Sequence, residues 1–328
     1  RRMQLARRVW ADGNGPEEEI QLDSGRPMAS GQFSNVYDAV LLRPNKQRVA
    51  VKIAWPSDAP SRPSESEIDI LSKLDHVNVA RLLYHFEVVT DSKRCSWLVL
   101  SFMPHSVASL RTRIRPRFDA IDACLYAFQL WNAIEYVNDK GYIHLDIKPS
   151  NMLINDETGV MQLCDFGNAR RESECRQLNP YQVTRFYRAP ELLFGATEVT
   201  VAVDWWAASC VTVELATGRP LLKEETADKQ SRLVAHVLGY PSAEQLRAMK
   251  AARPRFARRS GLAGGVRFLL DHVAAPLADL TARGLVYDPA ARPPPSQVKS
   301  DRYFDPLFSS PPPVRECGRA LPDFIRRP

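Results

Sequence analysis

The sequence predicts an α+β fold with two lobes: a small β-rich N-terminal lobe that carries one helix, and a larger α-helical C-terminal lobe. Three observations predict this arrangement. Residues 28–102 contain several short β-rich runs and a single helical run. From residue 120 onward, apolar residues recur mainly with helical periodicity. A chain of 328 residues with 45% hydrophobic content is also long enough to bury the core that two lobes require.

The first strands of the small lobe are expected to form a hairpin. Residues 28–40 and 47–53 are both β-rich, and the sequence LLRPNK between them indicates the connecting loop. Residues before about 25 are charged and contain glycine, so a weakly structured lead-in is expected there. Lys52 lies inside the second strand among apolar residues. A lysine in such a strand usually directs its amine to solvent unless an acid pairs with it.

A helical run offers that acid. Residues 65–74 carry apolar residues at helical spacing and contain neither proline nor glycine. Glu67, Leu71 and Leu74 share one face, because they stand at positions i, i+4 and i+7. If this face is buried, Glu67 is the predicted partner of Lys52. The alternative is that Glu67 lies on the solvated surface of the helix.

The rest of the chain changes from strands to helices. Residues 80–89 and 95–102 are two further β-rich runs that complete the small lobe. Residues 120–140 form a long amphipathic helix, and residues 201–217 are apolar almost all round, which predicts a buried helix. Asp204, within this last helix, either braces the loop described next or is an ordinary carboxylate at a helix N-terminus. The residue pattern leaves both readings open.

The chemistry is concentrated in residues 143–167, which read IHLDIKPSNMLINDETGVMQLCDFG. Asp146, Lys148 and Asn151 supply a carboxylate, a cation and an amide oxygen within six positions, and the proline after the lysine makes this segment a loop. Asp165 follows an apolar strand and adds a second carboxylate. Transfer of a phosphoryl group from magnesium-ATP needs these types of residue: a proton acceptor, a cation for phosphate and oxygen ligands for the metal.

Charge and cysteine content exclude some classes of protein. The net charge is +6, from 44 basic and 38 acidic residues, a mild bias that indicates no nucleic-acid partner. The six cysteines show no C-x-x-C spacing, which favours reduced thiols in the cytoplasm or nucleus. No apolar run is long enough to span a membrane, and the Arg-rich start lacks the apolar core of a signal peptide. The sequence begins without an initiator Met, so a missing targeting segment stays open.

Further motifs point to a family. VAVK surrounds Lys52, RFYRAPE occupies residues 185–191, DWW begins at Asp204, and Arg292 is placed to pair with Glu191. Together with the loop above, these motifs resemble the catalytic domain of eukaryotic protein kinases over residues 28–308. RFYRAPELL is typical of the CMGC group of that family.

Within the group, the chain most resembles glycogen synthase kinase-3. The segments that carry this resemblance are KLDHVNVARL, LVLSFMPHSV, LCDFGNAR, ELLFGATEVT and HVLGYPSAEQLRAM. FSNV and HLDIKPSN resemble spliceosome-associated pre-mRNA-processing kinases instead, which with the DYRK-like kinases are the second candidates. The expected organisation is an N-terminal extension (1–24), a kinase domain (25–308, with lobes 25–103 and 104–308) and a C-terminal tail (309–328).

The resemblance implies ATP and Mg²⁺ as cofactors, bound in a cleft between the lobes, and it assigns roles to single residues. Asp146 would be the catalytic base, Lys148 would hold the γ-phosphate, Asn151 and Asp165 would bind the metal, and Lys52, fixed by Glu67, would bind the α- and β-phosphates. The nucleotide would also contact the glycine-rich-loop positions Ala29, Gly31 and Ser34, the gatekeeper Leu100, the hinge residues Ser101 and Met103, and Val36 and Leu153 on either side of the base.

Regulation is implied in the same way. Tyr181 matches an activation-loop tyrosine that such kinases phosphorylate on themselves, and Arg185 and Arg188 would receive its phosphate. The family pocket for a pre-phosphorylated substrate uses three basic residues. The matching positions here are Ser66, Leu145 and Arg170, listed from the N-terminus. Since one of the three is basic, selectivity for primed substrates is predicted to be lost or weakened.

Two other functions compete with an active serine/threonine kinase. Of the three glycines expected in the nucleotide loop, only Gly31 is present, which favours a pseudokinase scaffold with weak nucleotide binding. A small-molecule phosphotransferase is disfavoured by RFYRAPE, a segment that shapes a peptide groove. The expected partners are protein substrates, with a scaffold protein docked near residues 232–246 as an open alternative. A monomer is expected, with no nucleic acid and no membrane.

Overall fold

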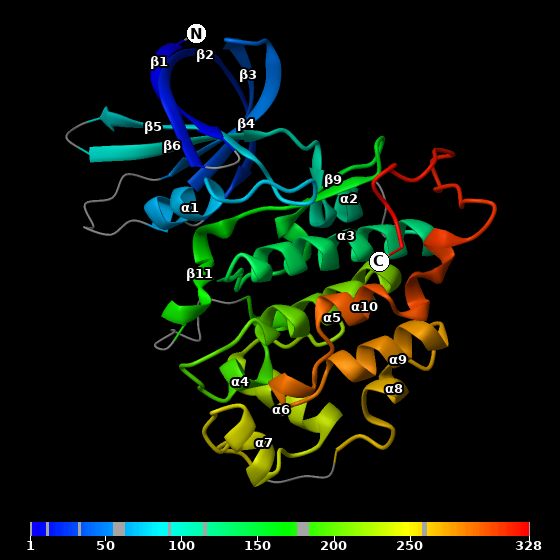
Figure 1. Cartoon of the computed structure of the whole chain (residues 1–328). Helices are drawn as coiled ribbons and strands as arrows, with labels where there is room; N and C mark the ends of the chain where they lie inside the picture. The colour runs from blue at the N-terminus through cyan, green and yellow to red at the C-terminus, as the bar shows by residue number, and fades with distance from the viewer. Residues whose placement is uncertain are drawn as a thin grey trace. The chain divides into compact units, whose positions relative to one another are not determined.

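The structure is a computed structural model that describes residues 2–10, 13–31, 34–54, 63–90, 93–113, 117–175, 184–257 and 261–327. The chain divides into two compact units (Figure 1). The first comprises Arg1–Pro104 with Cys164–Gly167, and the second comprises His105–Leu163 with Asn168–Pro328. Each unit is considered separately below.

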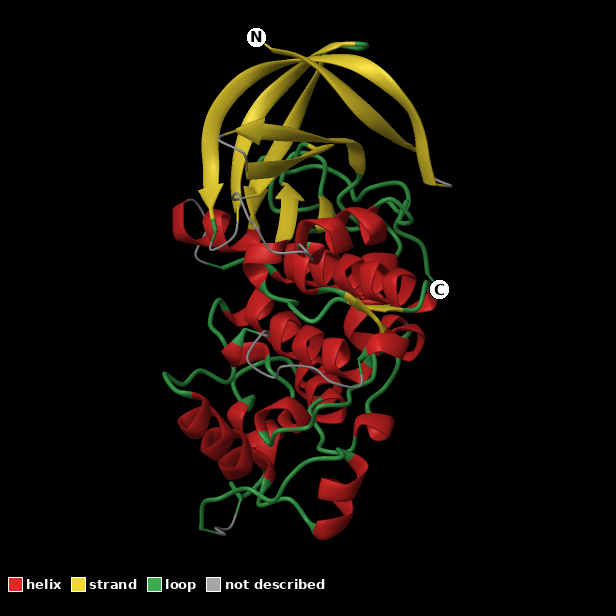
Figure 2. Cartoon of the chain, turned by 90° about the vertical axis from the view of Figure 1, so that its left-hand side faces the viewer, coloured by secondary structure: helices red, strands yellow, loops and turns green. Residues whose placement is uncertain are grey.

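The first unit is a closed β-barrel with one helix among its described residues. Its strands lie in the order β1-β2-β3-β4-β6-β5, and the antiparallel pairing of β1 with β5 closes the barrel. Figure 2 shows the curvature of these strands. Apolar side chains that alternate along the strands fill the interior, among them Ile20, Leu41, Val49 and Val99, each fully buried. The elements are β1 (Arg2–Trp10), β2 (Gly13–Ser30), β3 (Ser34–Arg43), β4 (Gln47–Ala54), α1 (Pro63–Leu71), β5 (Leu82–Thr90) and β6 (Lys93–Ser101).

The expectation of a weakly structured lead-in before residue 25 is wrong, because these residues form β1 and most of β2. Ala6 and Ile20 point into the barrel core. On the outside, Arg7 pairs across the strands with Glu17 at 2.9 Å, and a neighbouring arginine and glutamate lie 3.5 Å apart. The many charged residues of β1 and β2 leave few apolar residues in alternation, so the sequence pattern alone does not indicate strands. The two strands are recognised only from their pairing in the structure.

The hairpin of the predicted small lobe is present, with one change. β3 and β4 pair in antiparallel register from Ser34↔Ala54 to Leu41↔Gln47. The predicted strand over residues 28–40 is however two strands, since β2 ends at Ser30 and β3 begins at Ser34. The Gly31 N–H donates a hydrogen bond to the Ser34 carbonyl at 2.8 Å.

The second unit is mainly helical, and its centre is the packing of α3 (Ala120–Asp139) against α5 (Ala202–Thr217). The other helices are α2 (Val107–Arg113), α4 (Pro190–Leu193), α6 (Ala227–Leu238), α7 (Ala243–Ala248), α8 (Gly265–Leu269), α9 (Ala275–Gly284) and α10 (Pro295–Lys299). Short 3-10 turns are η1 (Pro149–Asn151), η3 (Glu172–Glu174), η5 (Arg185–Tyr187), η6 (Pro289–Ala291) and η7 (Arg302–Phe308). A further turn, η2 (Phe166–Asn168), begins in the first unit and ends in the second. Two small sheets join β7 (His105–Ser106), β9 (Met152–Asn155) and β10 (Val160–Leu163), and β8 (Tyr142–Ile143) with β11 (Arg170–Arg171).

Both long helices predicted from periodicity are present, and their ends follow from local chemistry. Asp119 caps α3 by accepting the Asp122 N–H (2.6 Å), and Gly141 then adopts the left-handed backbone that ends a helix (φ +79°). Gly218 does the same for α5, with φ +77°. Most side chains of α5 are buried, as its apolar sequence predicts. Among the described residues, no helix combines the length and the apolar character needed to cross a membrane.

Candidate active site

The loop between β8 and β9 brings its three predicted residues together in the second unit. Lys148 Nζ donates a hydrogen bond to Asp146 Oδ2 at 2.7 Å. Asn151 Nδ2 donates to the main-chain oxygen of Asp146 at 2.8 Å and to its Oδ2 at 3.2 Å. Because Nδ2 faces Asp146, the Oδ1 atom of the same amide points the other way, as a metal ligand requires. Asp146 and Asn151 are both buried.

Thr184 completes this group, and sequence reasoning missed it. Its Oγ1 donates to Asp146 Oδ1 at 2.6 Å and accepts from Lys148 Nζ at 3.2 Å. Asp146 therefore has a hydroxyl on one carboxylate oxygen and an amine on the other. The only signal in the sequence is a hydroxyl residue directly before the RFYRAPE motif, which is too common a feature to single out Thr184.

Asp204 of α5 binds the backbone of the catalytic loop. Of the two roles that the sequence left open for it, bracing the loop is therefore the one that the structure shows. Its Oδ2 accepts the His144 N–H at 2.8 Å, and its Oδ1 accepts the Leu145 N–H at 3.0 Å. Burial raises the pKa of Asp204 above its ordinary value, while His144 and the backbone donors oppose that rise. Leu145 has a left-handed backbone (φ +64°), a strained conformation for this residue type that the two bonds to Asp204 hold in place.

We expect Asp204→Asn to weaken both stability and turnover. The amide replaces one acceptor by a donor, so one buried N–H of the loop loses its partner, at a cost of about 1–3 kcal/mol of unfolding free energy. A displaced loop also moves Asp146, and kcat should fall about tenfold. Asp228→Asn, on the exposed face of α6, is the matched control. Thermal unfolding and steady-state kinetics check both effects, and an unchanged kcat would show that Asp204 does not position the loop.

A second group lies in the first unit, around Lys52. Val49 and Val51 point into the barrel, so the strand period directs Lys52 to the other face of β4. There its Nζ donates to Glu67 Oε1 at 2.7 Å and to Asp165 Oδ1 at 2.8 Å. Burial disfavours the charged amine, but the two carboxylates outweigh burial and raise the pKa of Lys52 above its ordinary value. The predicted contact between Lys52 and Glu67 is present, and the lysine does not direct its amine to solvent.

The Asp165 carboxylate is exposed enough to bind a second cation besides the Lys52 amine. Its side chain is 45% exposed, whereas that of Lys52 is 13% exposed and that of Glu67 is 4% exposed. Its backbone is left-handed, with φ +64°. An exposed carboxylate that already holds an ammonium group has the chemistry of a Mg²⁺ ligand, as does the Asn151 amide oxygen. Asp165 and Asn151 belong to different units, and each fits the predicted donor set separately.

The other predicted nucleotide contacts lie on several strands. Ala29 of β2 pairs with Val36 of β3, next to Gly31 and to Ser34, which begins β3. Leu100 of β6 pairs with Ala50 of β4, and the neighbouring Ser101 donates its N–H to the Arg81 carbonyl at 2.9 Å. Met103 is buried just beyond β6, and Leu153 lies on β9 of the second unit. Their roles toward a nucleotide stay predictions.

Of the regulatory residues, Tyr181 lies outside the described residues. Arg185 Nη1 donates to the Glu225 carbonyl, and Arg188 is buried. Arg170 Nη1 donates to the Ala169 carbonyl at 2.6 Å. The contact of Arg292 with Glu191 is present as predicted. It is bidentate, at 2.8 and 2.7 Å, and fully buried.

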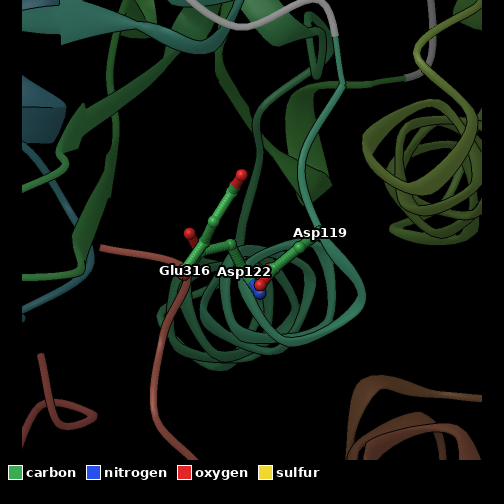
Figure 3. Close-up of side chains that lie close together, drawn as sticks. All are labelled: Asp119, Asp122 and Glu316. Atoms are coloured by element: carbon green, nitrogen blue, oxygen red, sulfur yellow. The ribbon is translucent and has the colours of Figure 1, made fainter. Parts of the chain in front are cut away.

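An acidic group elsewhere in the second unit has a structural explanation. Asp119, Asp122 and Glu316 are the one set of described residues whose carboxylates gather closely enough to hold a cation, with oxygens within 4.8 Å (Figure 3). Asp119 caps α3, and Asp122 binds Arg315 at 2.7 Å. Two of the three carboxylates are therefore already engaged, and no cation site is inferred.

A Lys–Glu–Asp group in a β-rich unit and an Asp–Lys–Asn–Thr group in a helical unit are the features expected of a phosphotransferase. The family profile described as "Protein kinase domain" matches residues 22–304. "Putative serine/threonine-protein kinase gskl-1" of Caenorhabditis elegans is 38% identical over 310 residues, which cover 93% of this chain and 84% of that protein. "Protein kinase gsk31" of Schizosaccharomyces pombe is 36% identical over 251 residues, 75% of this chain and 65% of its own length. The chain belongs to the protein kinase family, and the predicted resemblance to kinases of the glycogen synthase kinase-3 type is confirmed.

Proposed function

We propose that this chain transfers the γ-phosphoryl group of ATP to serine and threonine side chains of proteins, as a kinase of the glycogen synthase kinase-3 type. One observation carries the proposal: a buried carboxylate, Asp146, contacts both the Lys148 amine and the Thr184 hydroxyl in a chain of the protein kinase family. The name of the Caenorhabditis elegans relative supports the serine/threonine class.

The residues of the second unit suit the substrate side of this reaction. Asp146 accepts the proton of the attacking hydroxyl, and its contacts with Lys148 and Thr184 fix the direction of the accepting oxygen. Lys148 offsets negative charge on the transferred group. In the first unit, Lys52 is held charged and oriented by Glu67, as a phosphate-binding amine needs to be. Bound magnesium-ATP supplies the phosphoryl group and the counter-charge.

Phosphate mapping tests the proposal. The purified full chain is incubated with magnesium-ATP and myelin basic protein, beside the Asp146→Asn variant, and phosphorylated residues are located by mass spectrometry. We expect phosphate on serine and threonine of the substrate, and on Tyr181 by autophosphorylation, in the wild-type chain only. If the substrate is phosphorylated but Tyr181 is not, the proposed autophosphorylation is rejected and the proposed kinase activity stands.

The second candidate is a pseudokinase scaffold, which the nucleotide loop favours. Ala29 and Ser34 stand where glycines would let the backbone approach phosphate most closely. Small residues still permit an approach, so we expect weakened ATP binding and retained catalysis. A thermal shift with ATP but no phosphate on any substrate would support the scaffold and contradict the kinase.

Selectivity for primed substrates is expected to be weak. Two of the three positions that would bind a priming phosphate carry no charge, Ser66 and Leu145, and Leu145 is buried. Arg170 is the third. We expect kcat/KM to differ less than about fivefold between a peptide that has a phosphoserine four residues after its target and the same peptide without it, since a single partly exposed charge contributes at most about 1 kcal/mol. A preference above about thirtyfold for the phosphorylated peptide would contradict this expectation.

A further inference from the structure

A pocket of about 420 Å³ lies beside the catalytic loop, entirely within the second unit. Its walls come from α2, from the turn η1 and from η5, which contributes Tyr187. Pro149 and Ser150 line it, and these two residues separate Lys148 from Asn151 in the sequence. The pocket therefore adjoins the residues that a substrate hydroxyl must approach, and its volume suits a side chain.

The pocket also contains a buried carboxylate, Glu214 of α5, and both its oxygens are bound within the protein. Tyr187 Oη donates to Oε2 at 2.8 Å. Arg111 Nη1, from α2, donates to Oε1 at 2.6 Å, and its Nη2 donates to the Gly218 carbonyl. The Arg111 side chain is 13% exposed and that of Glu214 is 5% exposed, so this is a largely buried ion pair.

The charge of this pair determines what the pocket accepts. A buried carboxylate next to a substrate-binding loop is a receptor for a cationic side chain, because a guanidinium or ammonium group would satisfy its charge. Arg111 of the same chain already takes that place. A lysine or arginine of a substrate would gain nothing from Glu214 and would meet the positive charge of Arg111. An acidic side chain of a substrate would be repelled by the negative charge of Glu214.

We propose that this pocket is a subsite for one side chain of the protein substrate, and that Arg111 determines its selectivity. Arg111 neutralises Glu214, closes the subsite to lysine and arginine and leaves it open to uncharged side chains. The proposal rests on the proposed phosphoryl transfer and adds to it a rule for the sequence around the accepting residue. Arg111 acts on substrate choice, not on the chemical step.

A serine peptide library tests the rule. Each position around the serine is varied in turn, and kcat/KM is measured with the full wild-type chain, with Arg111→Met and with Arg111→Met combined with Glu214→Gln. We expect Arg111→Met to gain at least about tenfold for arginine at one position, because Glu214 then has no cationic partner in the protein and its Oε1 is open to the substrate. The double variant should lose that gain. Arg232→Met, which removes an exposed arginine of α6, should keep the wild-type profile.

The outcomes separate the two proposals. Turnover by Arg111→Met with no new preference at any position overturns the subsite and leaves the kinase intact. Absence of turnover on every peptide by the wild-type chain overturns the proposed phosphoryl transfer, and the subsite with it. If Arg111→Met does not fold, the proposal is tested by comparing the peptide profiles of the wild-type chain and the double variant. The wild-type chain should discriminate about tenfold against arginine at one position and the double variant should not, whereas equal acceptance of arginine and alanine at every position by the wild-type chain overturns the subsite.

Discussion

Replacement of Asp146 with Asn should lower kcat roughly 10³-fold and leave the fold intact, the largest effect expected on activity. Asparagine has the size of aspartate but accepts no proton, so the hydroxyl of the substrate loses its base. The change also removes the negative charge that Lys148 contacts at 2.7 Å, and it turns one of the two oxygens that accept from Lys148 and Thr184 into a donor. Steady-state kinetics on a peptide that the wild-type chain phosphorylates measures the change.

The control variant is Asp139→Asn at the exposed end of α3, which should keep the wild-type kcat. Thermal unfolding shows whether each variant is folded, and the ATP-induced shift shows whether the nucleotide still binds. A kcat of Asp146→Asn within about tenfold of the wild type would mean that another group accepts the proton, since general bases typically contribute 10²- to 10⁴-fold.

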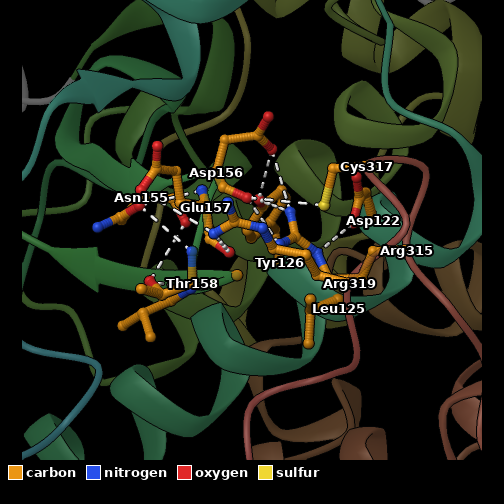
Figure 4. A network of polar contacts seen from close by, with 12 residues as sticks. Asp122, Leu125, Tyr126, Asn155, Asp156, Glu157, Thr158, Arg315, Cys317 and Arg319 are labelled. Atoms are coloured by element: carbon orange, nitrogen blue, oxygen red, sulfur yellow. Dashed lines mark hydrogen bonds and ion pairs between the residues drawn. The ribbon is translucent and has the colours of Figure 1, made fainter.

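The largest effect on stability is expected from Arg315, in the segment that follows η7. Its side chain is fully buried and binds Asp122 at 2.7 Å, the Tyr126 hydroxyl at 2.7 Å and the Asp156 main-chain oxygen at 2.7 Å (Figure 4). The C-terminal segment is thereby joined to α3 and to the turn between β9 and β10. Removal of one partner of a buried ion pair leaves the other charge uncompensated.

We therefore expect Arg315→Met to lower the unfolding free energy by about 3–5 kcal/mol. In a protein of this size the unfolding midpoint should fall by about 4–7 °C. Arg319→Met is the control, because Arg319 is exposed and its ion pair with Glu157 spans 3.9 Å. Its effect should stay below about 1 kcal/mol.

A combined variant separates charge from packing. When Asp122→Leu accompanies Arg315→Met, no buried charge is left unpaired at this contact, and the loss should be smaller than for Arg315→Met alone. A loss from Arg315→Met no larger than that from Arg319→Met would contradict the structural role of the buried pair.

Prediction from sequence was most successful where the signal is local. Asp146, Lys148 and Asn151 lie within six positions on a loop that proline keeps out of a helix, so their residue types and spacing alone indicated the group. Lys52 was noted as a lysine inside an apolar strand that needs an acidic partner, Glu67 was chosen as that partner from helical spacing, and the two side chains meet at 2.7 Å. The same reasoning failed before residue 25, because charged residues obscure the strand pattern there.

What the sequence determined by itself is therefore the two-lobed arrangement, the long helices and the groups that a short segment carries. Only the tertiary structure decided which distant side chains complete them. Thr184 reaches Asp146 across 38 positions, and Arg315 reaches Asp122 across 193. Asp204 was open between two readings until α5 was packed under the loop. The physical reason is that spacing along a chain fixes which face a residue occupies, whereas a contact between distant segments depends on how whole helices and turns pack together.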